Sequence, residues 1–139
     1  MFIPPLKIQV RFSDLDILGH VNNTIYLSYF EMARIHYFNA LVGPNWDWLK
    51  EGVVLVKNDV EYHIPILLHD EPTIFLFVTE IRNKSFSLAY KIMINEKLHT
   101  TGGSTLVCFD STIQQAITIP TIMREGLSTL IENENENEN

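Results

Sequence analysis

The turn formed by residues 11–23 concentrates more reactive side chains than any other stretch of this sequence. It holds two carboxylates, a glycine, an imidazole and two amides, namely Asp14, Asp16, Gly19, His20, Asn22 and Asn23. A carboxylate close to a helix N-terminus stays ionised, because the helix dipole favours negative charge there. An ionised carboxylate can act as a nucleophile or can activate a water molecule. Since so many polar groups between a strand and a helix seldom arise from packing alone, this turn is the first candidate for a functional site.

Several members of the turn also have structural interpretations. Capping of the turn or of the next helix is the first interpretation of Asp14, because aspartate often takes that role, and chemistry remains open for it. His20 is either a structural hydrogen-bonding residue or a neutral imidazole that holds a water or polarises a group. Gly19 allows a positive φ, and it also lets a substrate pass close to the backbone. These interpretations are compatible with one functional turn.

The two amides come directly before a predicted helix. Asn22, Asn23 or Thr24 can serve as its N-cap. The backbone N–H groups of the first helical turn lack partners within the helix. They can therefore donate hydrogen bonds to an oxygen on which negative charge develops.

A strand and a long helix must position this turn. Residues 7–12 alternate, with Ile8, Val10 and Phe12 on one face, which predicts a half-buried strand. Residues 24–42 predict a helix that is apolar almost all round and therefore buried, ended by Gly43. On this helix Glu31 is three residues from Arg34, so we expect a structural or intersubunit ion pair.

The remainder of the chain is rich in strand patterns. We expect strands over residues 52–64, 71–81, 86–94, 98–109 and 114–119, followed by a short helix from Pro120 to about residue 130. The pair Gly102-Gly103 predicts a bulge, a bend or the close approach of another backbone. Consecutive strands with tight turns form an antiparallel sheet. The predicted fold class is α+β, a long buried helix wrapped by an antiparallel sheet of about five or six strands.

Composition limits the possible functions. The 139 residues suit a single domain over residues 1–131, and the Glu/Asn repeat of residues 132–139 has nothing apolar to bury and should be disordered. A net charge of -7 argues against a nucleic-acid partner. No apolar run is long enough to span a membrane. A single cysteine, Cys108, excludes an internal disulfide, and a reducing cytoplasm is the simplest location. The histidines show no metal-ligand spacing, so we expect no metal.

The polar turn also carries a recognisable motif. The pattern D-x-D-x-x-G-H-V-N-N-x-x-Y runs from Asp14 to Tyr26 and continues as Tyr29-Phe30-Glu31-Met32-Ala33-Arg34. It resembles the signature of the hotdog-fold acyl-CoA thioesterases of the 4-hydroxybenzoyl-CoA thioesterase type. The resemblance covers roughly residues 7–130. It implies the hotdog fold, an acyl-CoA substrate, no cofactor, and a homodimer or homotetramer whose site lies at a subunit interface.

The resemblance also implies roles for individual residues. Asp16 would be the nucleophile or the general base, and the backbone N–H near Asn23 would bind the thioester oxygen. His20 would join them as a catalytic candidate. Candidate substrate-binding residues are Gly19, Asn22 and Tyr26 in the motif, and Arg82, Lys84 and Ser85 in a basic turn that would lie near the coenzyme A phosphates.

Hydrolysis of an acyl-CoA thioester to a free acid and coenzyme A is the main functional hypothesis. An acyl-carrier-protein thioesterase is the second hypothesis, with the same chemistry on a protein carrier. The third is a hotdog protein that binds acyl-CoA without turnover, against which Asp16 argues, and a hotdog dehydratase is a weaker fourth.

Overall fold

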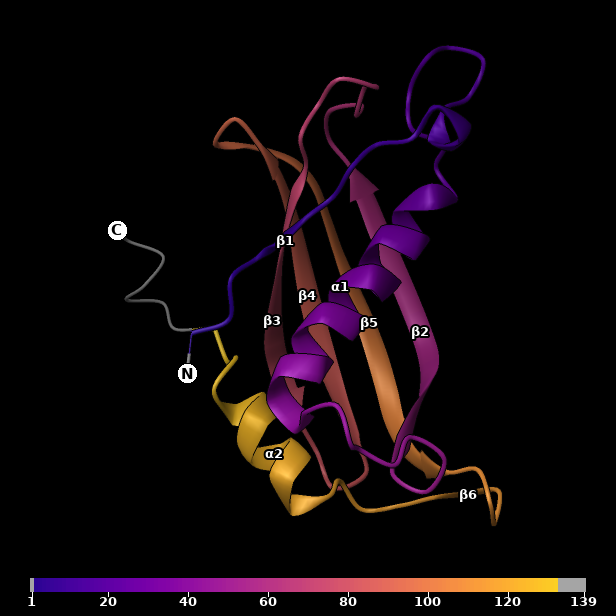
Figure 1. Cartoon of the computed structure of the whole chain (residues 1–139), viewed down its shortest axis with the longest axis vertical. Coiled ribbons are helices and arrows are strands. Elements are labelled where there is room, and N and C mark those ends of the chain that lie inside the picture. Colours follow the sequence, from indigo (N-terminus) through magenta and orange to yellow (C-terminus); the bar gives the residue numbers. More distant parts are fainter. Residues whose placement is uncertain (1, 133–139) are drawn as a thin grey trace.

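The chain folds as one curled antiparallel sheet around one long helix. The computed structural model describes residues 2–132, and Figure 1 shows the arrangement. In chain order the elements are β1 (Leu6–Lys7), a single 3-10 turn (Phe12–Asp14), α1 (Ile25–Val42), β2 (Gly52–Tyr62), β3 (Thr73–Ile81), β4 (Ser85–Ile94), β5 (Lys97–Asp110), β6 (Gln115–Ala116) and α2 (Thr121–Ser128). The predicted disorder of the C-terminal repeat concerns residues 133–139, which lie outside the described residues.

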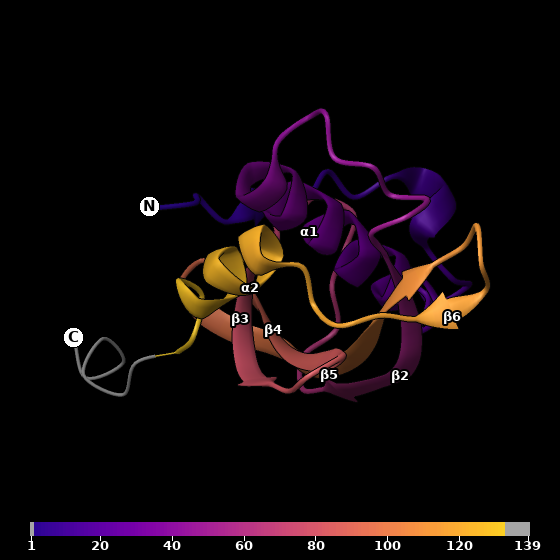
Figure 2. The same ribbon diagram turned by 90° about the horizontal axis from the view of Figure 1, so that it is seen from below.

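The sheet has six strands in the order β1-β3-β4-β5-β2, with β6 pairing to β5, and all of its pairings are antiparallel. Seen from below in Figure 2, the sheet curves beneath α1, and α2 lies beside α1 over β3. This confirms the predicted α+β class and the wrapped helix. Among the described residues β2 pairs only with β5, so its other edge has no strand beside it there.

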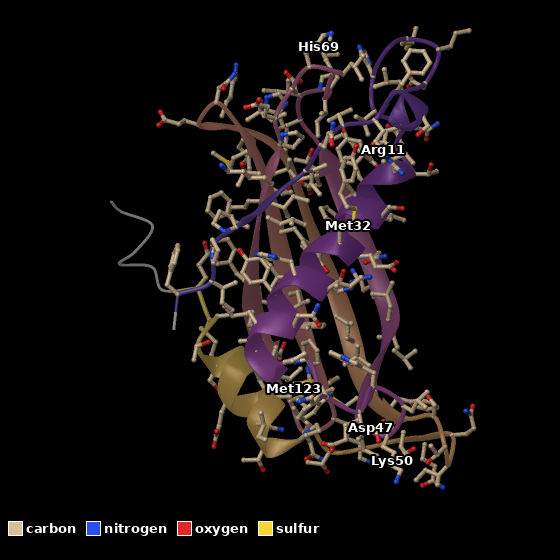
Figure 3. The ribbon with its side chains drawn as sticks, viewed as in Figure 1. Arg11, Met32, Asp47, Lys50, His69 and Met123 are labelled. Carbon is tan, nitrogen blue, oxygen red and sulfur yellow. The ribbon has the colours of Figure 1, made fainter. Side chains whose placement is uncertain are left out.

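One side of α1 forms the centre of the core. Its buried residues are Tyr26, Tyr29, Phe30, Ala33, Arg34, Tyr37, Phe38 and Leu41. The expectation that the helix is buried almost all round is wrong, because Leu27, Met32 and Ile35 are 38%, 47% and 55% exposed. Met32 is labelled in Figure 3. The open face of α1 therefore carries apolar side chains beside exposed polar residues such as Ser28 and Glu31.

Gly102 allows a close contact between α1 and the sheet. A Cβ at this position would lie 2.5 Å from the Phe30 ring and 2.7 Å from the carbonyl oxygen of Asp59. Of the alternatives for the glycine pair, close approach is the one found, and the approaching groups are an aromatic ring of α1 and the backbone of β2. At this position β5 therefore lies directly against the Phe30 ring of α1.

Two predicted strands are much shorter in the structure. β1 pairs over only Leu6 and Lys7, after which the chain leaves β3 and crosses towards the start of α1. Ile8 and Val10 are buried as the alternation predicted, but Phe12 is 82% exposed, which corrects its assignment to the inner face. The last predicted strand is reduced to β6. The length of a strand depends on how much of a neighbouring strand is available for pairing, and the apolar pattern does not show this.

No helix of the described residues is long and apolar enough to cross a membrane.

Candidate functional site

Asp14 is the structural anchor of the polar turn. Its side chain is 1% exposed and accepts four hydrogen bonds. Arg11 donates its backbone N–H (3.0 Å) to Oδ2 and its guanidinium Nε (3.2 Å) and Nη2 (3.0 Å) to Oδ1, and the Tyr29 hydroxyl donates to Oδ2 (2.7 Å). Burial alone would raise the pKa of Asp14, but these bonds and the Arg11 charge outweigh it and hold the pKa below its usual value. The geometry favours the structural interpretation of this carboxylate.

Asp16 is held differently and keeps one oxygen free. Its Oδ1 accepts the backbone N–H groups of Leu18 (2.9 Å) and His20 (3.2 Å), which fixes the side chain against its own turn. Among the described residues no protein group donates to Oδ2. Gly19 completes the turn with φ of +77° and donates its N–H to the Asp16 carbonyl (3.0 Å). An L side chain at this φ would be strained, so the glycine shapes the turn that presents Asp16.

The residues just before α1 use their backbone N–H groups in different ways. The Asn22 side chain accepts from the N–H (3.0 Å) and the hydroxyl (2.9 Å) of Thr24, and its carbonyl accepts from the N–H of Ile25 (2.9 Å). Of the three cap candidates, Asn22 therefore does the capping. Its own N–H donates to the Asp14 carbonyl (2.8 Å). The N–H of Asn23 has no acceptor among the described residues.

Four of the predicted site residues line one cavity of about 250 Å³. The lining residues are Asp16, His20, Val21, Asn23, Tyr26, Tyr62, His63, Ile64 and Pro65. The polar turn, the first turn of α1 and the segment that leaves β2 each contribute a wall. Backbone bonds join these segments, including one from the Val21 N–H to the Ile66 carbonyl (2.8 Å). The lining residues supply one carboxylate, two imidazoles and, at Asn23, a backbone N–H without an acceptor among the described residues, a set suited to an electrophilic carbonyl.

Tyr62 and His63 were not predicted from the sequence. The Tyr62 hydroxyl donates to the Asn23 carbonyl (2.9 Å), and His63 Nε2 lies 3.2 Å from the Thr101 hydroxyl. Both residues come from the end of β2, about forty positions from the motif. Only the packing of β2 against α1 brings them to the cavity, and no local pattern signals it.

The basic turn lies at the other end of the sheet. In Figure 1 the connection between β3 and β4 is at the end near α2, whereas the polar turn is at the opposite end. β3 has nine residues, so the two turns are separated by about 30 Å. Arg82 pairs with Glu80 (2.5 Å), and its carbonyl accepts from Arg124 (2.7 Å). Within one chain, Arg82, Lys84 and Ser85 therefore do not meet Asp16.

The predicted ion pair between Glu31 and Arg34 does not form within the chain. Arg34 is 8% exposed and donates to the Tyr90 hydroxyl (3.0 Å), which donates to Ser104 (2.8 Å). No ion pair of Arg34 is found among the described residues. Both charged side chains line a groove of about 390 Å³ between α1 and β2. The intersubunit alternative stays a prediction.

Comparison with known proteins identifies the family of this fold and motif. Residues 10–127 match the family model of the thioesterase-like superfamily. The chain belongs to the thioesterase-like superfamily. Long-chain acyl-CoA thioesterase FadM of Escherichia coli K12 is 28% identical over 131 residues, which cover 90% of this chain and 97% of FadM. Residues 10–127, which match the family model, include the whole polar turn.

Solved structures of thioesterases have the same architecture. A thioesterase from Thermus thermophilus, complexed with coenzyme A and Zn, is 35% identical, with 93% and 95% of the two chains covered and a TM-score of 0.79. A predicted thioesterase from Bacillus stearothermophilus is 23% identical, with 93% and 96% covered and a TM-score of 0.84, and this likeness concerns the fold alone. The hotdog-fold thioesterase recognised from the motif is confirmed, together with its enzyme class.

The described part of this thioesterase shows no cluster of three or more His, Cys, Asp or Glu side chains that could hold a metal ion.

Proposed function

We propose that the chain hydrolyses acyl-CoA thioesters to a free carboxylic acid and coenzyme A, with Asp16 as the reacting carboxylate. One observation carries the proposal. The free oxygen of Asp16 and the unpaired N–H of Asn23 belong to residues that line the same cavity. FadM, named a long-chain acyl-CoA thioesterase, and the Thermus thermophilus thioesterase complexed with coenzyme A support the choice of substrate.

The chemistry follows from what each group can do. Asp16 Oδ2 either takes a proton from a water that attacks the acyl carbon, or attacks that carbon itself and is released by water in a second step. The Asn23 N–H donates to the thioester oxygen as the carbon becomes tetrahedral. The C–S bond then breaks, the sulfur leaves with the electron pair, and a proton from water ends on it. His20 lines the cavity, and in this proposal it would hold a water. Either route gives one acid and one thiol.

A second copy of the chain would complete the substrate site. β2 is an open edge strand of eleven residues with Val54 and Val56 42% and 58% exposed, and such edges tend to pair. Antiparallel pairing of two β2 edges reverses one sheet relative to the other. The turn of Arg82, Lys84 and Ser85 in one protomer then lies at the same end as the polar turn of its partner. A homodimer, or a homotetramer built from it, is therefore part of the proposal.

The same interface would pair two charges that have no ion-pair partner among the described residues. Glu31 and Arg34 line the groove beside β2, and in a two-fold interface Glu31 of one protomer can face Arg34 of its partner. A buried guanidinium favours such a partner, because an unpaired buried charge is costly.

Two broader predictions belong to the same proposal. One domain spans residues 1–131. A cytoplasmic location fits the single thiol, Cys108, which is fully buried and whose pKa burial raises to about 11, so that it is poorly reactive. Cell fractionation tests the location, and a cell-surface or extracellular pool would contradict it.

A substrate panel tests the proposal. Purified protein is assayed against short, long and aromatic acyl-CoAs and against an acyl-carrier protein loaded with the same acyl groups. We expect release of free coenzyme A from at least one acyl-CoA. If only the acyl-carrier-protein substrates are cleaved, the protein is an acyl-carrier-protein thioesterase. Tight acyl-CoA binding without turnover would leave a binding protein and contradict hydrolysis.

A further inference from the structure

Tyr62 joins the end of β2 to the first turn of α1. Its hydroxyl donates to the Asn23 carbonyl (2.9 Å), and its ring meets the Tyr26 ring edge-on, with centroids 4.8 Å apart and planes at 87°. Tyr26 is 2% exposed, so one side of the Tyr62 ring rests on a fixed surface. Both tyrosines line the cavity that holds Asp16. Tyr62 therefore contacts the backbone of the residue whose N–H is unpaired.

The two peptide groups on either side of Asn23 are both held. The preceding group, which contains the Asn23 N–H, is fixed through the Asn22 carbonyl by the N–H of Ile25 (2.9 Å). The following group is held through the Asn23 carbonyl by Tyr62. With both neighbours fixed, the Asn23 N–H has a defined direction before any substrate binds. A donor oriented in advance stabilises a developing oxyanion without reorganisation, which makes it effective in catalysis.

We propose that Tyr62 is a positioning residue for the oxyanion site. It holds the peptide group that follows Asn23 and so helps to fix the direction in which the Asn23 N–H meets the thioester oxygen in the transition state. The role rests on the proposed thioester hydrolysis. Tyr62 does not touch the reacting atoms in this role, since its hydroxyl is used by the Asn23 carbonyl. Tyr62 would therefore stabilise the transition state and not the bound substrate, because the negative charge on the thioester oxygen develops only in the transition state.

The test is Tyr62→Phe, which removes the hydroxyl and keeps the ring against Tyr26. We expect kcat for the best acyl-CoA substrate to fall about 10- to 100-fold, as small misplacements of a catalytic group do, with KM changed less than about twofold. Tyr37→Phe is the matched control. Tyr37 is a buried tyrosine of α1 whose hydroxyl lies by the Leu76 backbone, away from the cavity. It should keep the wild-type kcat.

Two non-hydrolysable ligands separate positioning from a general structural role. One is a coenzyme A thioether that resembles the ground state, and the other is a trifluoromethyl ketone analogue that forms an oxyanion in the site. Tyr62→Phe should bind the thioether like the wild type and the ketone more weakly, by the factor lost in kcat. The role of Tyr62 would be overturned if the variant lost affinity for both ligands by the same factor. It would also be overturned if the variant kept the wild-type kcat and the wild-type affinity for the ketone. A folded wild type that cleaves no thioester would instead overturn the proposed function.

Discussion

The Tyr29 hydroxyl donates a 2.7 Å hydrogen bond to Asp14 across fifteen positions of sequence, and so ties the polar turn to the buried face of α1. Burial and the bond to Asp14 both raise the pKa of Tyr29, which keeps the phenol protonated as a donor. The two carboxylates of the motif thus divide their tasks. Asp14 holds the turn in place, and Asp16 lines the cavity with an Oδ2 to which no protein group among the described residues donates.

Replacing Asp14 with asparagine should therefore lower stability. The carboxylate accepts charge-assisted bonds from Arg11, so we expect Asp14→Asn to cost about 1–3 kcal/mol of unfolding free energy at pH 7. Urea unfolding followed by circular dichroism measures it. Asp47→Asn is the control, because Asp47 is exposed and makes only local bonds to its own turn.

The same substitution has a defined pH dependence. The folded-state pKa of Asp14 lies below its unfolded value of about 3.9, so the unfolded chain binds more protons between the two values. Its stabilising contribution is complete above the unfolded pKa and is lost as pH falls through the folded pKa. The difference between wild type and Asp14→Asn should therefore shrink on acidification below about pH 4. A difference that stays constant down to acid pH would contradict the assigned bonds.

Lys84 should act on the nucleotide end of the substrate. In the proposed dimer this cation approaches the coenzyme A phosphates, so Lys84→Ala should raise KM for acyl-CoA by about three- to tenfold, about 1 kcal/mol, and leave kcat unchanged. KM for an acyl-pantetheine, which lacks the nucleotide, should not change. Lys97→Ala at the opposite hairpin is the control. Equal effects on both substrates would place Lys84 outside the phosphate site.

A charge on the open edge strand should break the dimer. Val56 is 58% exposed on β2, and Val56→Lys would place two ammonium groups close together across the two-fold interface. Sedimentation should show a dimer for the wild type and a monomer for the variant, with activity lost in parallel. Ile122→Lys on α2, where the side chain is 57% exposed, should remain dimeric. A monomeric, active wild type would contradict the composite site.

The features that depend on neighbouring residues in the sequence were predicted correctly. The helix of residues 25–42 and four of its neighbouring strands followed from apolar pattern and turn residues. Asp16, His20, Asn23 and Tyr26 line one cavity because eleven consecutive positions, folded as one turn and the start of a helix, cannot separate them far. In this part of the chain, residues that are close in the sequence are also close in the structure.

Long-range geometry could not be predicted in the same way. Tyr62 reaches Asn23 because of how β2 packs beside α1, and Phe12 is exposed because β1 ends after two paired residues. The distance from Arg82 to the polar turn depends on the direction of β3, which residue pattern does not specify. Each of these features depends on pairing or packing between distant segments.

The central claim is that the Asp16 carboxylate drives thioester cleavage, and the steady-state kinetics of Asp16→Asn test it most directly. Asparagine can keep the acceptor for Leu18 and His20 but lacks the charged oxygen. Asp47→Asn is a matched control, because Asp47 accepts the backbone N–H groups of Leu49 and Lys50 in a similar turn at the opposite end of the molecule (Figure 3). On the best acyl-CoA, kcat should fall by at least about a hundredfold for Asp16→Asn and stay at the wild-type value for Asp47→Asn. A folded Asp16→Asn protein that keeps kcat within about threefold of the wild type would contradict the account.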